Sequence, residues 1–206
     1  GMLISYFLRT KLRVHIYTGQ VWITRSGLIK KLLKFVDLLI GLCSTHCLAD
    51  SNSQKKFLEI SKIVTKHKIT VLGNGSICGV DTNKFKPNVN YRNTIRKELK
   101  IPNDSIVLLF LGRLNKDKGI LDLANSLKIL CVENKELDIH LLVIGNDEGN
   151  IVKKVNFICK NIISKIHFVN FTSEPEKYMA AADIFCLPSY REGFGMAALE
   201  AGAVSL

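Results

Sequence analysis

The sequence predicts an α/β protein built on parallel sheets, and three observations support this prediction. Short apolar segments of strand length alternate with amphipathic segments of helical length along most of the chain. Residues 106–111 are an unbroken apolar run, which is typical of a parallel strand covered on both faces. The composition is 47% hydrophobic and 23% charged, so we expect a packed core rather than disorder.

The first part of the chain contains three expected strands and two expected helices. Leu28, Leu32, Phe35 and Leu39 recur at helical spacing and are flanked by lysines, which predicts an amphipathic helix. Asp50 or Ser51 can cap the second helix, which would end near residue 60. The expected strands are residues 13–17, 47–49 and 69–72, and the first helix is residues 27–42.

Residues 73–81 are rich in Gly and Asn, which favours turns, and we expect a domain junction there. This predicts two domains, residues 1–75 and 76–206. The second repeats the alternation. Its expected strands are residues 106–111, 139–144, 166–169 and 184–187; its expected helices are residues 118–132, 147–159 and 174–181, with a last helix after residue 192.

Positive charge is concentrated in residues 1–75. These hold twelve Lys or Arg and three Asp or Glu, which gives a net charge of +9, whereas the net charge of the whole chain is +11. Such a face attracts lipid headgroups, lipid diphosphates or acidic glycans, although an ordinary solvated basic face explains the charge equally well. Lys30, Lys31 and Lys34 on the first helix favour peripheral contact with an anionic membrane. No nucleic-acid recognition motif is present, so we expect no nucleic-acid partner.

The six cysteines include no Cys-x-x-Cys pair and no His cluster at zinc spacing, so we expect free thiols in a reducing cytoplasm. Residues 2–8 are too short for a secretory signal. Lysines interrupt the apolar run of residues 28–47, which therefore predicts no membrane span. The expected location is the cytoplasm, with peripheral attachment at the inner face of the membrane.

Two cations follow the apolar run 106–111, in Gly112-Arg113-Leu114-Asn115-Lys116-Asp117-Lys118-Gly119. Open α/β sheets bind ligands at the carboxyl ends of their strands, which is where Arg113 and Lys118 would lie. Arg offers a planar fork to phosphate oxygens and Lys a compact charge, so the pair fits a diphosphate. Alone, this spacing would indicate an exposed basic loop; its place after a buried strand favours binding.

Two carboxylates, Glu192 and Glu200, stand with seven residues between them in Glu192-Gly193-Phe194-Gly195-Met196-Ala197-Ala198-Leu199-Glu200. The glycines allow a ligand to approach the backbone, and the following helix offers free N–H groups to an anion. Carboxylates suit the hydroxyls of a sugar and a ribose. In isolation, Glu200 would more commonly be a solvent-facing helix residue.

Together, the two motifs resemble the donor site of retaining glycosyltransferases of family 4, which have the GT-B fold of two facing Rossmann-like domains. The resemblance implies that residues 1–75 are the C-terminal part of the acceptor-side domain. Residues 76–206 would be the donor-binding domain, truncated at its C-terminus, so that both domains are incomplete. It further implies retaining transfer of a hexose from a UDP-sugar to a glycan or lipid-linked acceptor, in cell-surface polysaccharide assembly.

The same resemblance assigns roles to individual residues. Arg113 and Lys118 would bind the donor diphosphate, Glu192 the sugar hydroxyls and Glu200 the ribose. Gly193 and Gly195 would bring backbone close to the donor, with Phe194 packed beneath the loop. Residues expected near the nucleobase are Asn170, Phe171 and Thr172. Gln20 would stand where many family members place a His that reaches the donor sugar.

Several alternatives follow from what the sequence lacks or leaves open. No Asp-x-Asp is present, so the two cations would neutralise the diphosphate and we expect no metal and no cofactor. No Gly-x-Gly-x-x-Gly or P-loop occurs, which disfavours an oxidoreductase or an NTPase. A GT-B nucleotide-sugar epimerase remains an alternative that the spacing of the glutamates argues against. The other alternative is a truncated, inactive fragment that binds nucleotide sugars. The uncovered apolar faces of such a fragment would favour self-association.

Overall fold

The computed structural model describes residues 1–76 and 78–206; Ile77, in the expected junction, lies outside the described residues. The chain forms two compact units. Unit 1 comprises residues 1–79 and 191–195, and unit 2 comprises residues 80–190 and 196–206. The short segment 191–195 therefore groups with unit 1, although the residues on both sides of it belong to unit 2.

Unit 1 contains a parallel three-stranded sheet in the order β1-β2-β3. Its strands are β1 (Val14–Tyr17), β2 (His46–Ala49) and β3 (Ile69–Val71), and its helices are α1 (Met2–Phe7), α2 (Gly27–Cys43) and α3 (Asn52–Ile60), with 3-10 turns η1 (Val21–Thr24) and η2 (Lys66–Lys68). Ser51 caps α3, because its Oγ accepts a hydrogen bond from the Gln54 N–H at 3.1 Å. Lys68 donates to the carbonyls of Gly41 and Leu42 at the end of α2, where a cation is favoured.

Helix α2 is apolar on more than one side. Leu33 and Leu38 pack against the core of unit 1, whereas Leu28 and Leu32 of the stripe that predicted the helix are 85% and 62% exposed. Among the described residues, no helix combines the length and the apolar character that crossing a membrane requires.

Unit 2 contains a parallel four-stranded sheet in the order β6-β5-β4-β7. The strands are β4 (Ile106–Leu111), β5 (Ile139–Ile144), β6 (Ile166–Val169) and β7 (Ile184–Phe185). The helices and 3-10 turns are α4 (Val89–Glu98), η3 (Lys116–Lys118), α5 (Ile120–Glu133), α6 (Ile151–Ile158), η4 (Ile163–Lys165), α7 (Pro175–Ala181) and α8 (Met196–Ala203). The predicted α/β class with parallel sheets is confirmed.

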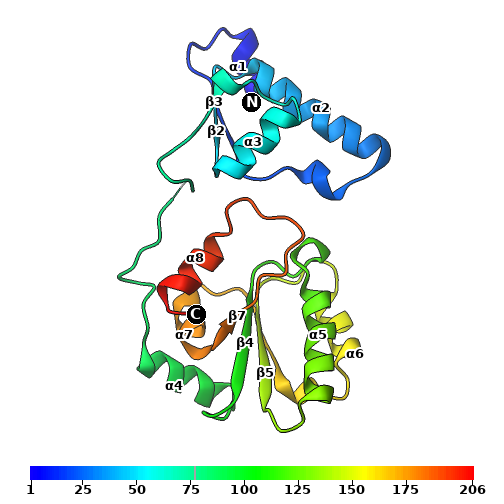
Figure 1. The fold of residues 1–206 in the computed structure, drawn as a ribbon, viewed down its shortest axis with the longest axis vertical. Helices are drawn as coiled ribbons and strands as arrows, with labels where there is room; N and C mark the ends of the chain where they lie inside the picture. Colours follow the sequence, from blue (N-terminus) through cyan, green and yellow to red (C-terminus); the bar gives the residue numbers. More distant parts are fainter. Residues whose placement is uncertain (77) are drawn as a thin grey trace. The chain divides into compact units, whose positions relative to one another are not determined.

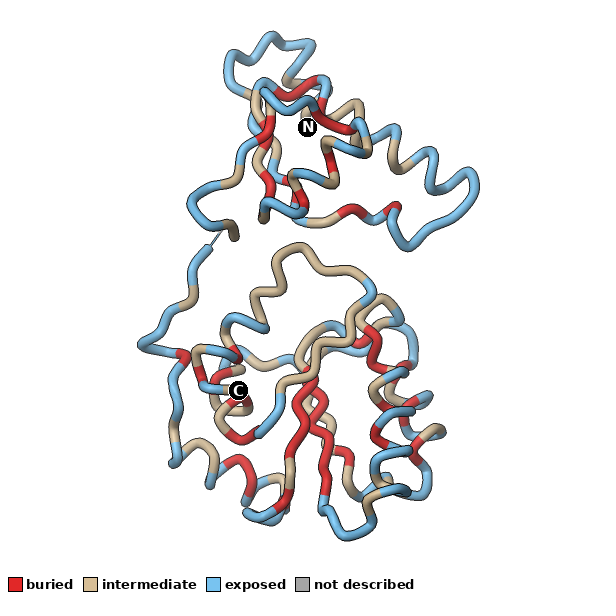
Figure 2. Tube along the Cα trace, in the orientation of Figure 1, coloured by how far each residue is buried: buried red, intermediate tan, exposed pale blue. Residues whose placement is uncertain are grey.

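The central strands of unit 2 are covered on both faces, as their apolar sequences predict (Figure 2). Helices α5 and α6 lie on one side of β4 and β5, and α4, α7 and α8 lie on the other (Figure 1). Two apolar clusters result, one on each face of the sheet.

Some predicted boundaries were wrong. The helix expected from residue 118 begins at Ile120, because Gly119 adopts a left-handed conformation with φ of 69°. The helix expected from residue 147 begins at Ile151, because Asp147 is outside it and accepts the Ile151 N–H at 2.7 Å. Strand β7 ends two residues before the predicted end at 187. Helices α1 and α4 were not predicted.

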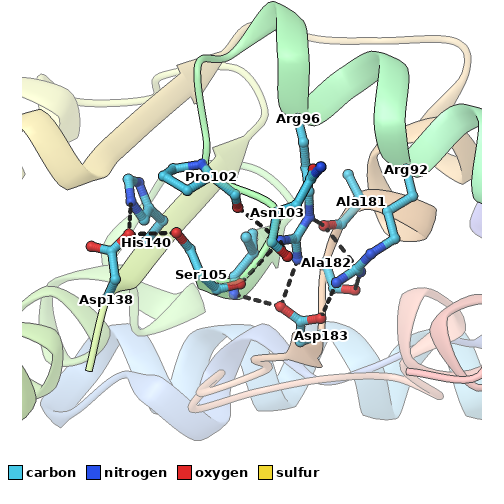
Figure 3. A network of polar contacts seen from close by, with 11 residues as sticks. Arg92, Arg96, Pro102, Asn103, Ser105, Asp138, His140, Ala181, Ala182 and Asp183 are labelled. Carbon is cyan, nitrogen blue, oxygen red and sulfur yellow. Dashed lines mark hydrogen bonds and ion pairs between the residues drawn. The ribbon is translucent and has the colours of Figure 1, made fainter. Parts of the chain in front are cut away.

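An ion pair between the fully buried Arg96 and the partly exposed Asp183 fixes the start of β7 (Figure 3). Arg96 of α4 is fully buried and donates to Asp183 Oδ2 at 2.7 Å; the same oxygen accepts the Val107 N–H of β4 at 2.7 Å. Arg92 donates a hydrogen bond to the other carboxylate oxygen, Asp183 Oδ1, at 2.6 Å. The remaining Arg96 donors bind carbonyls of residues 102, 103, 105 and 181. One guanidinium thus joins α4, the α4–β4 loop, the end of α7 and β7.

Charged partners also determine the protonation of this carboxylate. Burial alone raises the pKa of Asp183, but the Val107 N–H and the two arginines outweigh burial, so that its pKa lies below the ordinary value. A depressed folded-state pKa means that ionised Asp183 stabilises the fold above the unfolded pKa, and that this stabilisation is lost as the pH falls.

A second cluster of polar side chains lies at the amino end of the same sheet. Asp138 accepts hydrogen bonds from Ser105 and from His140 Nε2, and forms an ion pair with Lys165 at 3.0 Å. The Ser105 hydrogen bond is the largest cause that lowers the pKa of Asp138 to about 2. His140 Nδ1 lies 2.9 Å from His167 Nε2, so a hydrogen bond joins the side chains of two adjacent strands.

We expect Arg96→Met to destabilise unit 2 by about 3 kcal/mol at pH 7, because it leaves Asp183 and several carbonyls without their buried donor. Arg92→Met is the matched control and should cost about 1 kcal/mol, since Arg92 is partly exposed. Urea denaturation measures both. The Arg96 deficit should shrink below about pH 4, as Asp183 becomes protonated in the unfolded chain. Equal effects of the two variants would contradict the central role of Arg96.

Candidate functional site

A pocket of about 290 Å³ opens at the carboxyl end of the unit 2 sheet. It is formed where β4, β5 and β6 end and α7 begins. The lining residues are Leu111, Gly112, Arg113, Ile144, Gly145, Asn146, Phe171, Thr172 and Pro175. Three residues predicted from the sequence, Arg113, Phe171 and Thr172, are thus brought together in one pocket, as the carboxyl-end rule for parallel sheets suggests.

The pocket floor depends on a close approach of two backbone turns. Gly145 has a φ of 146°, and a Cβ added there would lie 1.9 Å from the Gly112 carbonyl oxygen. The Gly112 N–H bonds to the Ile144 carbonyl at 3.0 Å, so the turns after β4 and β5 remain paired beyond the strands. Only glycine fits at position 145, and no side chain fills the space between the two turns.

Arg113 stands at the pocket with 63% of its side chain exposed. Its guanidinium forms an ion pair with Glu148, in the loop after β5, at 3.6 Å. The other Glu148 oxygen accepts a hydrogen bond from Asn115 Nδ2 at 2.9 Å. An exposed, positively charged side chain of a pocket-lining residue is therefore paired with a carboxylate of the neighbouring loop.

Lys118 ends η3, directly before the amino end of α5. Gly119 follows in its left-handed conformation, and a Cβ there would lie 2.1 Å from the Pro188 carbonyl oxygen. Tyr190 binds the same region twice, through its N–H to the Asp117 carbonyl and through its hydroxyl to Asp122, both at 2.9 Å. The loop after β7 is thereby fixed against the amino end of α5.

Glu200 lies in α8 and is partly buried. Burial is the largest cause that raises its pKa above the ordinary value; Lys84 lowers it and Glu176 raises it further. Lys84 also pairs with Glu176 at 3.4 Å and donates to the Ser173 carbonyl at 3.1 Å. Glu200 is thus a half-buried carboxyl in a charged setting rather than a solvent-facing helix residue.

Glu192, Gly193, Phe194 and Gly195 belong to unit 1, as does Gln20. Gln20 is only 2% exposed, and among the described residues its Nε2 has no hydrogen-bond partner.

Within unit 1, the backbone of Gly193 approaches Thr18 and Asp50 so closely that an added Cβ would lie 2.0 Å from the Thr18 carbonyl oxygen. Asp50 is buried, which raises its pKa. The carboxyl ends of β1 and β2 therefore present buried polar groups.

Sequence reasoning missed Gly145, Asn146 and Glu148. Their signal was present, since a Gly-Asn-Asp-Glu turn follows the buried run 139–144 just as Gly112-Arg113 follows the run 106–111. Asn170, which was predicted beside Phe171, is exposed and does not line the pocket. In the part of the chain that the structure describes, no group of three or more His, Cys, Asp or Glu is placed to hold a metal ion.

Comparison with known families identifies the class of protein. Residues 91–206, more than half of the chain, match the profile of the family described as glycosyl transferases group 1. The chain belongs to this family.

Two curated relatives are glycosyltransferases. The chain is 30% identical over its whole length to the capsular polysaccharide biosynthesis glycosyltransferase CapM of Staphylococcus aureus, covering 53% of that protein. It is 27% identical to the UDP-Gal:alpha-D-GlcNAc-diphosphoundecaprenol alpha-1,3-galactosyltransferase of Escherichia coli, over 89% of this chain and 46% of that protein. The chain spans about half the length of these relatives.

Solved structures agree on the fold. HepE of Anabaena in complex with UDP superposes with a TM-score of 0.78 at 18% identity, covering 98% of this chain and 54% of HepE. WaaG, a glycosyltransferase involved in lipopolysaccharide biosynthesis, superposes with a TM-score of 0.74 at 19% identity, covering 95% and 55%. The predicted GT-B type of fold is confirmed by these neighbours.

We expect Gly119→Ala to destabilise unit 2 by about 2–4 kcal/mol, because the Cβ adds both left-handed strain and a clash with the Pro188 carbonyl. Gly149→Ala is the matched control: its φ is 122°, but the space around it is open, so it should cost about 1–2 kcal/mol. Urea denaturation gives both values. A Gly119 variant as stable as the Gly149 variant would mean that the close contact does not constrain the loop.

Proposed function

We propose that this chain carries the donor half of a retaining glycosyltransferase of family 4, which moves a sugar from a UDP-sugar to a glycan or lipid-linked acceptor. The observation that carries the proposal is the unit 2 pocket, where Arg113 and Phe171 meet at the carboxyl end of a parallel sheet. Such an edge is where α/β folds bind nucleotides.

The pocket suits a nucleobase followed by a diphosphate. Phe171 is 72% exposed beside the pocket and offers a flat apolar face, while Gly112 and Gly145 leave the pocket floor free of side chains. Arg113 and Lys118 then supply the positive charge for the diphosphate, whose negative charge grows as the sugar departs. These two cations perform the neutralisation that a metal would otherwise supply, so we propose metal-independent binding.

The two glutamates bind the remaining parts of the donor, which are the sugar and the ribose. Glu192 holds the sugar hydroxyls while positive charge grows at the anomeric carbon, and Glu200 accepts hydrogen bonds from the ribose. Gln20 takes the position of the sugar-contacting His of many family members. The departing diphosphate accepts the proton of the acceptor hydroxyl on the same face of the sugar, which gives retention.

The acceptor is proposed from the names of two relatives, because CapM is named for capsular polysaccharide biosynthesis and the galactosyltransferase for a diphosphoundecaprenol-linked sugar. A lipid-linked acceptor lies at a membrane. The exposed Lys30 and Lys31 and the exposed Leu28 and Ile29 of α2 support the proposal of peripheral contact with an anionic inner membrane face, and we propose a cytoplasmic location on that basis.

UDP should bind this chain equally well with and without EDTA, as measured by isothermal titration. Arg113→Ala and Lys118→Ala should each lose about 1.5–3 kcal/mol of binding free energy, the range for hydrogen bonds to charged groups. Strict dependence on magnesium or manganese would contradict the metal-independent mechanism. An unchanged affinity in both variants would remove the two cations from the site.

Glu192→Gln should weaken binding of UDP-glucose or UDP-galactose while leaving the affinity for plain UDP nearly intact, because UDP has no sugar to hold. Glu200→Gln should weaken UDP itself through the ribose. The same titrations measure both, with circular dichroism to check folding. Reversed effects would mean that the two carboxylates have exchanged roles.

Charge reversal of Lys30, Lys31 and Lys34 to Glu should reduce binding to anionic liposomes, measured by co-sedimentation. Each basic residue near such a surface is worth about 1 kcal/mol. Binding should also fall as salt rises, because salt screens exposed charges.

The matched control reverses three exposed lysines of unit 2, Lys97, Lys128 and Lys135. If both triple variants lose liposome binding equally, only the net charge matters and α2 has no special role.

A further inference from the structure

We propose that Glu148 is a positioning residue for Arg113, which it holds at the pocket in the orientation that a diphosphate requires. The inference rests on the proposed function, namely that the unit 2 pocket binds a nucleoside diphosphate. Glu148 lies in none of the motifs that carry the family resemblance, and it does not line the pocket itself.

Both carboxylate oxygens of Glu148 are directed toward the loop after β4. Oε1 lies 3.6 Å from Arg113 Nη1, and Oε2 accepts the Asn115 Nδ2 hydrogen bond at 2.9 Å. The hydrogen bond from Asn115 fixes the carboxylate plane, and the ion pair then restricts the guanidinium. The carboxylate therefore bridges two residues that flank Leu114.

The backbone beneath this bridge is fixed as well. The Leu114 N–H donates to the Asn146 carbonyl at 2.9 Å, and the Glu148 N–H donates to the Leu114 carbonyl at 3.0 Å. Leu114 is only 2% exposed and anchors both hydrogen bonds in the core. Asp147 binds the first N–H groups of α6. Glu148 thus extends from a short, fully tied turn, and its position does not depend on a flexible loop.

Such a pair contributes little to stability, since exposed ion pairs are worth about 0–1 kcal/mol. Its effect is on the freedom of the Arg113 side chain, which is 63% exposed. A guanidinium has five N–H donors, and Glu148 faces only Nη1, so the other donors stay available to phosphate oxygens. Glu148 can remain in place while a diphosphate binds. Immobilising one long side chain in advance corresponds to about threefold to tenfold in affinity.

A double-mutant cycle tests this inference by isothermal titration with UDP. Glu148→Gln keeps the shape and the hydrogen-bond acceptor but removes the charge, and it should weaken UDP binding about threefold to tenfold. In the Arg113→Ala background, the same change should have no further effect, because Glu148 acts only through Arg113. Glu136→Gln is the matched control; this exposed residue precedes β5, at the opposite end of the strand, and its variant should bind UDP as the unaltered chain does.

Three results would overturn the inference. Unchanged or tighter UDP binding by Glu148→Gln would show that the carboxylate does not prepare the arginine. An equal loss in the Arg113→Ala background would show that Glu148 acts on UDP or on the fold directly. A loss of the same size in the Glu136 control would reduce the effect to net charge. Absence of UDP binding by the unaltered chain would instead contradict the proposed function, so the two failures are distinguishable.

Discussion

The ion pair of the buried Arg96 with Asp183 is the constraint on which unit 2 depends. Asp183 precedes β7 and accepts a hydrogen bond from the Val107 N–H of β4, so the ion pair sets the register of β7 beside β4. The position of β7 in turn determines where the loop after it begins, including Pro188 and its contact with Gly119. A buried charge without its partner is costly, so the pairing leaves few alternative positions for the strand.

The pocket is a product of backbone geometry more than of side chains. Parallel strands bring three loops to one edge, and two glycines let the first two loops touch. Side chains are then added around an opening that already exists: Arg113 from one loop and Phe171 from another. At the opposite, amino end of the strands, hydrogen bonds connect Asp138, His140 and His167, and none of these residues lines the pocket. The pocket and the polar anchoring cluster thus lie at opposite ends of the same strands.

Much of the fold could be predicted from the sequence, because apolar runs such as residues 106–111 and 139–144 indicate strands that are covered on both faces of the sheet. Helix α4 could not, since Val89 and Ile95 give little apolar periodicity and its stability comes from the distant Asp183. The pairing of Glu148 with Arg113 also depends on loop contacts 35 residues apart in the chain. The first motif identified Arg113 and the family resemblance identified Phe171, whereas the contacts of Asn146 and Glu148 with the loop after β4 required the three-dimensional arrangement.

The contact between Gly119 and Pro188 has a consequence for exchanging parts between members of the family. The two positions are 69 residues apart in sequence but share one small volume. A chimera that takes the segment around residue 119 from one parent and the loop after β7 from another inherits two halves of a single fit. Recombination points placed outside residues 112–190 keep both halves from the same parent, and the geometry of the loop is then transferred intact.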